Sequence, residues 1–178
     1  MYGLVNQGIK DLVLSLSNQE TWTQICLDAN APDEYISMQY YEDETTYRLV
    51  AAVSKKLNLQ PEKILGEFGK YWILYTAKEG YGPIMDLFGE DFKSCLKNLN
   101  HLHSRMGMTM PKLSPPSFIF TELSDTKFQL EYKSKRSGLS PMVQGLLEGL
   151  AIKYNTKVEI NYSEINERKI FTLEIVGK

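Results

Sequence analysis

The sequence predicts an α+β domain in which a helical first part is followed by an antiparallel sheet with one inserted helix. Up to about residue 106, apolar residues recur at spacings of three and four, the period of an amphipathic helix. From about residue 117 they alternate with polar residues, the period of a strand, except over 141–154. A run of helices followed by a run of strands is typical of α+β folds.

The helices of the first part are placed by their apolar periodicity together with capping residues and prolines. Asparagine and serine are good N-caps, and proline is tolerated in the first helical turn. The glycine- and proline-rich segment EGYGP, at 79–83, predicts a loop. Helices are expected over 2–17, from a cap at Ser17 or Asn18 to an interruption at Pro32, from Thr45 or Thr46 to Leu57, from Pro61 to Tyr75, and over 90–106.

The second part contains four alternating segments and one helix. A polar turn around Ser124 and Asp125 joins the first two strands, and the NER segment at 166–168 predicts a hairpin loop. The helix begins at Pro141 and carries leucines on one side. Strands are expected over 117–123, 127–135, 157–165 and 169–176.

Length and composition describe a single globular domain. The 178 residues include 43% hydrophobic and 24% charged residues, with a net charge of −2, so nothing points to a nucleic-acid partner. Two cysteines, Cys26 and Cys95, exclude a disulfide scaffold and a multi-cysteine zinc site. Lys10 and Asp11 interrupt the N-terminal apolar pattern, so this segment lacks the unbroken apolar core of a signal peptide. Apolar runs such as YWILY are too short to span a membrane. A soluble cytoplasmic protein is expected.

The two histidines of the sequence fall on different faces of the expected helix over 90–106. At about 100° per residue, measured from Phe92, His103 lies within the apolar stripe and His101 lies on the solvent side. A core histidine bonded to nearby carbonyls is the ordinary explanation. The alternative is a metal or haem ligand, and a haem iron needs one protein ligand on its proximal side because the porphyrin supplies four donors.

A second candidate feature is the segment EYKSKRSG. On a strand, Tyr132, Ser134 and Arg136 share one face, which then carries a phenol, a hydroxyl and a guanidinium. All three can donate hydrogen bonds, and arginine can bind a carboxylate through two of them. Taken alone, the pattern also describes the solvated side of an ordinary strand.

Together, these features resemble the H-NOX family of haem nitric oxide and oxygen binding domains, related to the sensor of soluble guanylate cyclase. The resemblance is carried by His103 in NLNHLHSRMG, by the Y-x-S-x-R motif that begins 29 residues later, and by Pro116 in SPPSF between them. The opening MYGLVNQGIKDLV is also typical of the family. The resemblance covers the whole chain, 1–178, and implies a haem buried between a helical distal part, about 1–60, and a proximal part with the sheet, 61–178.

The resemblance implies a role for each motif residue. His103 is then the proximal ligand of the iron of haem b, Fe-protoporphyrin IX, and Tyr132, Ser134 and Arg136 bind its propionates. Pro116 presses on the haem. Val5 and Ile9, on the first helix, belong to the distal side.

The choice of gas depends on the distal side, because bound O2 needs a hydrogen-bond donor there. Oxygen-binding family members resemble one another in placing a tyrosine on the helix after the motif, where this sequence has Pro141. Ser140 and Gln144 are the only polar alternatives nearby, although Trp72 or Tyr75 could enter from another helix. We therefore expect a sensor that binds NO and CO at ferrous iron and little O2.

The resemblance also implies the output. No kinase or cyclase segment follows the sheet, so we expect a stand-alone bacterial sensor, not an enzyme, that signals in trans to a histidine kinase or a diguanylate cyclase. A haem peroxidase or oxygenase would need a distal acid–base pair or a thiolate ligand. Two alternatives remain: a haem or gas carrier without signalling, and a haem-free module in which His103 is a core residue.

Overall fold

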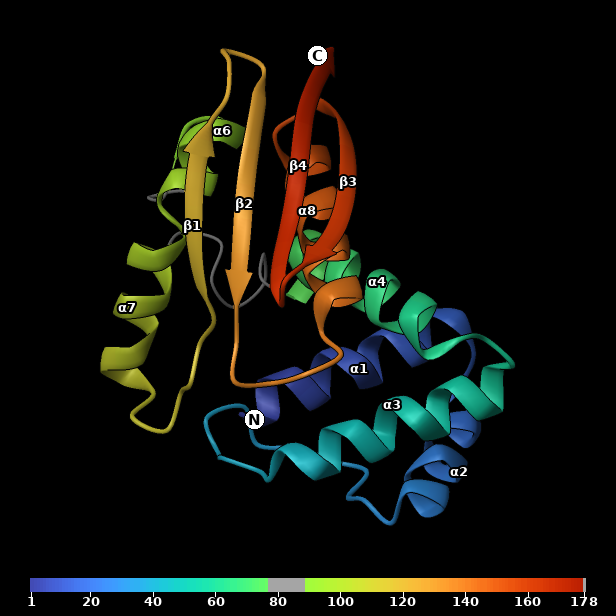
Figure 1. Ribbon diagram of the computed structural model, residues 1–178. Helices are drawn as coiled ribbons and strands as arrows, with labels where there is room; N and C mark the ends of the chain where they lie inside the picture. The colour runs from blue at the N-terminus through green and yellow to red at the C-terminus, as the bar shows by residue number, and fades with distance from the viewer. Residues whose placement is uncertain (77–88, 178) are drawn as a thin grey trace.

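The computed structural model describes residues 1–76 and 89–177, and it shows a four-stranded sheet standing on a layer of N-terminal helices (Figure 1). One helix, α8, lies behind the sheet, and two helices flank its outer strand β1. The predicted α+β class is confirmed. The elements are α1 (Gly3–Leu16), α2 (Gln19–Ala29), α3 (Asp43–Leu57), α4 (Pro61–Tyr71), a π-helical turn η1 (Trp72–Thr76), α6 (Phe92–Lys97), α7 (Leu99–Thr109), β1 (Ser117–Glu122), β2 (Lys127–Lys133), α8 (Ser140–Lys153), β3 (Lys157–Ile165) and β4 (Arg168–Gly177).

Most helices of the N-terminal layer begin and end close to the residues that the sequence predicts. The side chain of Asn18 accepts a hydrogen bond from the Thr21 amide at 2.9 Å and caps α2. Asn58 closes α3 in the left-handed conformation, with φ of 52°. The start of α3 lies earlier than predicted, at Asp43, because acidic residues in a first turn interact favourably with the helix dipole.

The sheet is fully antiparallel, with strand order β1-β2-β4-β3. The chain crosses from β2 to β3 through α8, which covers the inner face of the sheet, and β4 then fills the position between them. Asn166 and Glu167, with φ of 50° and 64°, form the two-residue turn of the last hairpin. The loop predicted at 79–83 lies outside the described residues.

The single helix predicted over 90–106 is wrong in one respect: the structure contains two helices. Asn98, with φ of −96° and ψ of 2°, ends α6 and precedes α7, which continues to Thr109. Asparagine side chains compete with the helical backbone for hydrogen bonds, so a break at this residue is physically reasonable. Asp91 and Ser94 form a capping box that fixes the start of α6.

Two hydrophobic cores stabilise the fold, one among α1–α4 and one between α8 and the sheet. Helix α4 takes part in both halves. Its Ile64 and Phe68 belong to the helical core, while a Cβ at Gly69 would collide with the backbone of Met142 on α8. Because α4 contacts both the helical core and α8, these contacts do not mark a boundary near residue 60, and the predicted division into a distal part, 1–60, and a proximal part, 61–178, stays a prediction. None of the described helices is long and apolar enough to cross a membrane.

Candidate functional site

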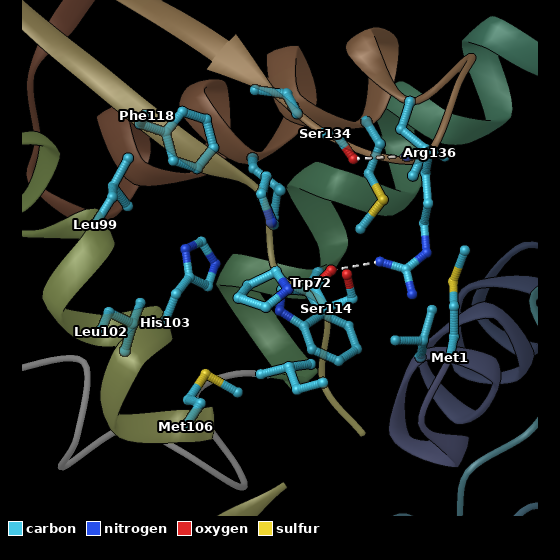
Figure 2. A pocket seen from close by; sticks show the side chains of 18 of the residues that line it. Met1, Trp72, Leu99, Leu102, His103, Met106, Ser114, Phe118, Ser134 and Arg136 are labelled. Carbon is cyan, nitrogen blue, oxygen red and sulfur yellow. Dashed lines mark hydrogen bonds between the residues drawn. The ribbon is translucent and has the colours of Figure 1, made fainter. Parts of the chain in front are cut away.

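A cavity of about 270 Å³ lies where the helical layer meets the sheet (Figure 2). Helix α7 and strands β1 and β2 supply one wall, and α1, η1 and α8 supply the other. Nearly all of the lining is apolar. The polar exceptions include His103 and Arg136, which Figure 2 shows at opposite ends of the cavity. The other polar side chains of the described lining belong to Tyr2, Lys112, Ser114, Tyr132 and Ser134.

His103 projects from α7 into this cavity, whereas His101 is exposed, as their positions on the predicted helix indicate. Its Nδ1 atom is buried and has no hydrogen-bond partner among the described residues. The imidazole stacks on Phe118, with ring centroids 5.9 Å apart. Burial lowers the pKa of His103, which keeps the ring neutral, the form in which imidazole binds metals.

Helix α7 differs from a helix packed against a hydrophobic core, because its apolar side is not fully buried. Its apolar side carries Leu99, Leu102 and Met106, all of which line the cavity, yet none of the helix's residues is fully buried. Apolar side chains normally gain about 1.5–3 kcal/mol each from full burial. An apolar helix face with a buried orphan nitrogen at its centre fits an occupant that would cover both.

At the other end, the Y-x-S-x-R residues converge, but not as one strand face. Strand β2 ends at Lys133, two residues before its predicted end, so Ser134 and Arg136 reach the cavity from the following loop. The Ser134 hydroxyl accepts a hydrogen bond from the Arg136 amide at 3.0 Å. Burial raises the pKa of Tyr132, opposed by a hydrogen bond with Ser134 and by the charge of Arg136. This Ser134–Arg136 bond turns the chain and brings the three side chains together.

The guanidinium of Arg136 joins parts of the chain that are distant in sequence. Its Nε donates to Oδ2 of Asp43 at 2.7 Å, and its Nη1 donates to the Ser114 carbonyl at 2.6 Å. Burial acts to raise the pKa of the Asp43 carboxyl, but hydrogen bonds and charges from Arg136 and the N-terminal ammonium outweigh it and lower the pKa. Arg136 is thus held at the edge of the cavity, between the first turn of α3 and the loop before β1.

Phe118 connects the two ends of the site, and sequence reasoning missed it. It pairs directly with Tyr132 across β1 and β2, with ring centroids 5.7 Å apart, and stacks on His103. Aligning the two predicted strands as a hairpin could have revealed this pair. Asp43 was also missed, although its place in an acidic helix start was visible, and the Ser114 carbonyl has no side-chain signal.

The other wall receives some of the expected residues and not others. Val5 and Pro116 line the cavity. Ile9 does not, because it lies one turn further along α1 and is buried in the helical core. Trp72 lines the cavity from η1, whereas Tyr75 is exposed outside it.

Helix α8 adds only apolar side chains to this wall. They are Met142, Val143, Leu146, Leu147 and Leu150. Ser140, Pro141 and Gln144 line a separate surface depression, and the Gln144 amide donates to Glu148 at 3.3 Å.

The donor set fits a haem and does not fit a polydentate metal site. Among the described residues, no three His, Cys, Asp or Glu side chains are grouped so that they could hold a metal ion. A lone neutral imidazole in an apolar cavity, with a guanidinium and two hydroxyls at the far end, matches an iron porphyrin with carboxylate side chains. His103 would ligate the iron, and Tyr132, Ser134 and Arg136 would bind the carboxylates.

Comparison with known proteins identifies relatives over most of the chain. The family model described as Haem-NO-binding matches residues 2–162. The chain is 30% identical over 155 residues to the soluble guanylate cyclase gcy-32 of Caenorhabditis elegans, covering 85% of this chain and 23% of that protein. For gcy-35 of the same organism, identity is 28% over 176 residues, covering 95% and 25%. The chain thus spans about a quarter of the length of these relatives.

Solved structures share the fold at lower sequence identity. The H-NOX protein of S. oneidensis in its Fe(II)NO state has a TM-score of 0.89 at 21% identity, over 98% of this chain and 99% of that one. The Fe(II) unliganded H-NOX protein of K. algicida has a TM-score of 0.88 at 19% identity, over 100% and 98%. With a family model across nearly the whole chain, and with this cavity, the chain belongs to the haem-NO-binding (H-NOX) family of haem-based gas-sensing domains.

Proposed function

We propose that this domain senses NO and CO through a haem b held between His103 and the Tyr132–Ser134–Arg136 group, and that it binds little O2. The observation that carries the proposal is the buried Nδ1 of His103, which has no protein partner among the described residues. Burying such an atom unpaired costs about 1–3 kcal/mol. A role as the ligand of an iron held in the cavity would explain why an imidazole is buried here.

When bound, haem would supply an iron that takes up diatomic gases, and His103 would be its protein ligand. The chain's own residues do the rest. Burial lowers the pKa of His103 and so favours its neutral form, and stacking on Phe118 orients its ring. Arg136 brings a positive charge to the end of the cavity where carboxylates would otherwise lie unpaired, which is costly in an apolar environment.

The proposed preference for NO and CO rests on the chemistry of the wall opposite α7. The residues that α8 contributes there are aliphatic or methionine, and Val5 adds another apolar surface. Bound O2 is polar and gains most from a hydrogen-bond donor. Among the described residues on this side of the cavity, the indole of Trp72 and the phenol of Tyr2 are side-chain donors, and the Tyr2 hydroxyl already accepts a hydrogen bond from the Lys112 amide at 3.1 Å. Trp72 is therefore the first residue to test for O2 binding.

Non-covalent haem b is favoured by the positions of the cysteines. Thioether attachment of haem uses a C-x-x-C-H motif, which the sequence lacks. Cys26 lies in the helical core and Cys95 in the sheet core, and neither lines the cavity. Their buried, free thiols also suit the reducing cytoplasm that we propose for this domain, which we take to be bacterial.

For the output, we propose that the domain is not itself catalytic and signals to a partner, a sensor histidine kinase or a diguanylate cyclase. Support comes from its relatives, which carry the name of guanylate cyclases although this chain spans only a quarter of their length. The test is to mix the purified domain with each candidate enzyme, with and without NO, and to measure phosphorylation or cyclic dinucleotide formation. Unchanged rates with both would contradict signalling and favour a carrier.

The haem and gas proposals are tested by absorption spectra of the purified, reduced protein. We expect a red protein whose Soret band shifts when NO or CO is added and stays unchanged after brief mixing with air. A colourless protein after expression with haem would contradict the cofactor proposal. A stable spectrum of ferrous oxy-haem in air, distinct from that of the oxidised ferric protein, would contradict the discrimination against O2, and its loss in Trp72→Phe would identify the indole N–H as the cause.

A further inference from the structure

Trp72 occupies a position that no other described residue shares. It is partly buried, and it packs against both the helical core and the sheet core. It also lines the cavity, on the wall other than the one that carries His103 (Figure 2). A side chain that contacts the ligand space and both cores can transmit a displacement from one to the other two.

The indole is tightly held on its far side. A Cβ placed on Gly8 of α1 would lie 3.0 Å from Cε3 and 3.1 Å from Cζ3 of Trp72, closer than side-chain carbons normally approach. A larger residue at this position would require the ring to shift by a few tenths of an ångström, so glycine allows the benzo edge of the ring to lie close to the backbone of α1. Phe68 adds an edge-to-face contact at 5.8 Å and 69°. The ring is therefore in close contact with both α1 and α4.

The backbone at Trp72 departs from regular α-helix. Helix α4 ends at Tyr71, and Trp72 opens the π-helical turn η1, which also brings the buried Ile73 against α8. π-Helical turns are rare and frequently mark functional sites. Within this turn, Trp72 lines the cavity and Tyr75 is exposed.

We propose that Trp72 is the positioning residue through which a gas ligand in the cavity acts on the N-terminal helices. The inference rests on the proposed haem function and names the residue that carries its signal. A ligand that enters the space facing His103 meets the indole, and the indole shifts α1 relative to the sheet core. Two-state coupling of this kind requires one element that contacts both sites, and Trp72 meets that requirement.

The experiment is hydrogen–deuterium exchange of the haem-loaded protein, with and without NO, read at the amides of α1. In the wild type we expect NO to change exchange over residues 3–16. In Trp72→Ala and Trp72→Phe we expect that change to shrink about fivefold or more for Ala, the lower end of usual coupling factors, and less for Phe. Haem content and the NO spectrum are measured alongside, and exchange is compared only between haem-loaded samples that are saturated with NO.

Tyr75→Ala is the matched control, because it removes an aromatic ring from the same π-helical turn outside the cavity. It should leave the NO-induced change in α1 intact. If both Trp72 variants keep the full change, or if Tyr75→Ala removes it equally, the inference is wrong while the gas-sensing function stands. A wild-type protein that takes up no haem would overturn the proposed function, and with it this inference.

Discussion

The two polar ends of the cavity differ in how far the protein alone satisfies them. At one end, Arg136 donates hydrogen bonds to Asp43 and to the Ser114 carbonyl, and Ser134 accepts one from the Arg136 backbone. At the other end, His103 buries a nitrogen that has no partner among the described residues. The first arrangement is a hydrogen-bonded bridge between α3 and the loops that flank β1 and β2, whereas the second leaves a nitrogen unpaired within the described part of the chain.

This difference distinguishes a motif residue that contributes to fold stability from one that is proposed to serve only the cofactor. Arg136 serves the fold and, by our proposal, the cofactor, so its loss should affect both. The buried His103 nitrogen, unpaired among the described residues, should by contrast reduce the stability of the haem-free fold, and by our proposal its role is to bind the cofactor. Substitutions at the two ends should therefore move apoprotein stability and haem retention in different combinations.

The largest expected effect comes from His103→Leu. Haem content should fall by more than about tenfold, since even the outer partners of metal ligands are worth 10–100-fold. At the same time the haem-free protein should become more stable by about 1–3 kcal/mol, because the orphan nitrogen is removed. Soret absorbance per protein and urea unfolding of the haem-free form measure the two effects.

His101→Leu is the control for this variant, because His101 is exposed on the same helix. It should leave haem content unchanged. A haem-free His103→Leu protein that is less stable than wild type would show that the imidazole contributes to the fold after all, and would weaken the contrast between the two ends.

Arg136→Ala should have the next largest effect, and at both levels. Loss of its charged hydrogen bonds to Asp43 should destabilise the haem-free protein by about 1.5–3 kcal/mol. Haem dissociation should also become faster, although less than in His103→Leu, because Tyr132 and Ser134 remain. Lys135→Ala, an exposed neighbour, should change neither quantity. Unchanged haem dissociation in Arg136→Ala would contradict the carboxylate-binding role.

A smaller effect is expected from pH through Asp43. The pKa of its carboxyl is lowered in the folded protein, so its ion pair contributes stability that is complete above the ordinary value of about 3.9. That contribution is lost as the pH falls through the folded pKa. Urea unfolding at pH 6 and at pH 3 should show a wild-type advantage over Asp43→Asn that shrinks on acidification. A difference that is constant with pH would assign the stabilisation to hydrogen bonds instead of charge.

The sequence predicts most of the fold because periodicity and caps are local signals. Asn18, Asn58 and Pro61 mark helix ends that the structure confirms. The break at Asn98 and the π-helical turn at Trp72 were not predicted, because neither clearly interrupts the helical spacing of the apolar residues. Such departures depend on packing against the rest of the molecule.

The site was predictable where chemistry is concentrated in few residues. His103 and Arg136 both line the cavity. They could be identified from the sequence because an imidazole on an apolar helix face and a guanidinium beside other donors are unusual patterns. Phe118 and Asp43 escaped, since one depends on strand register and the other on a contact across 93 residues of chain. The strand predicted through Lys135 ends at Lys133, yet Tyr132, Ser134 and Arg136 all line the cavity.

The smallest effects should distinguish Val5 from Ile9, which share a side of α1 but not a role. Ile9→Val removes one methyl from the helical core and should cost about 0.5–1.5 kcal/mol in unfolding free energy, with the CO association rate unchanged. Val5→Ala enlarges the cavity wall and should change the CO association rate, with less effect on stability because Val5 is only half-buried. Flash photolysis of the CO complex and urea unfolding of both variants give the four numbers needed. If Ile9→Val alters CO association as much as Val5→Ala does, the boundary between cavity and helical core is not where this structure draws it, and the gas-facing surface extends a further turn along α1.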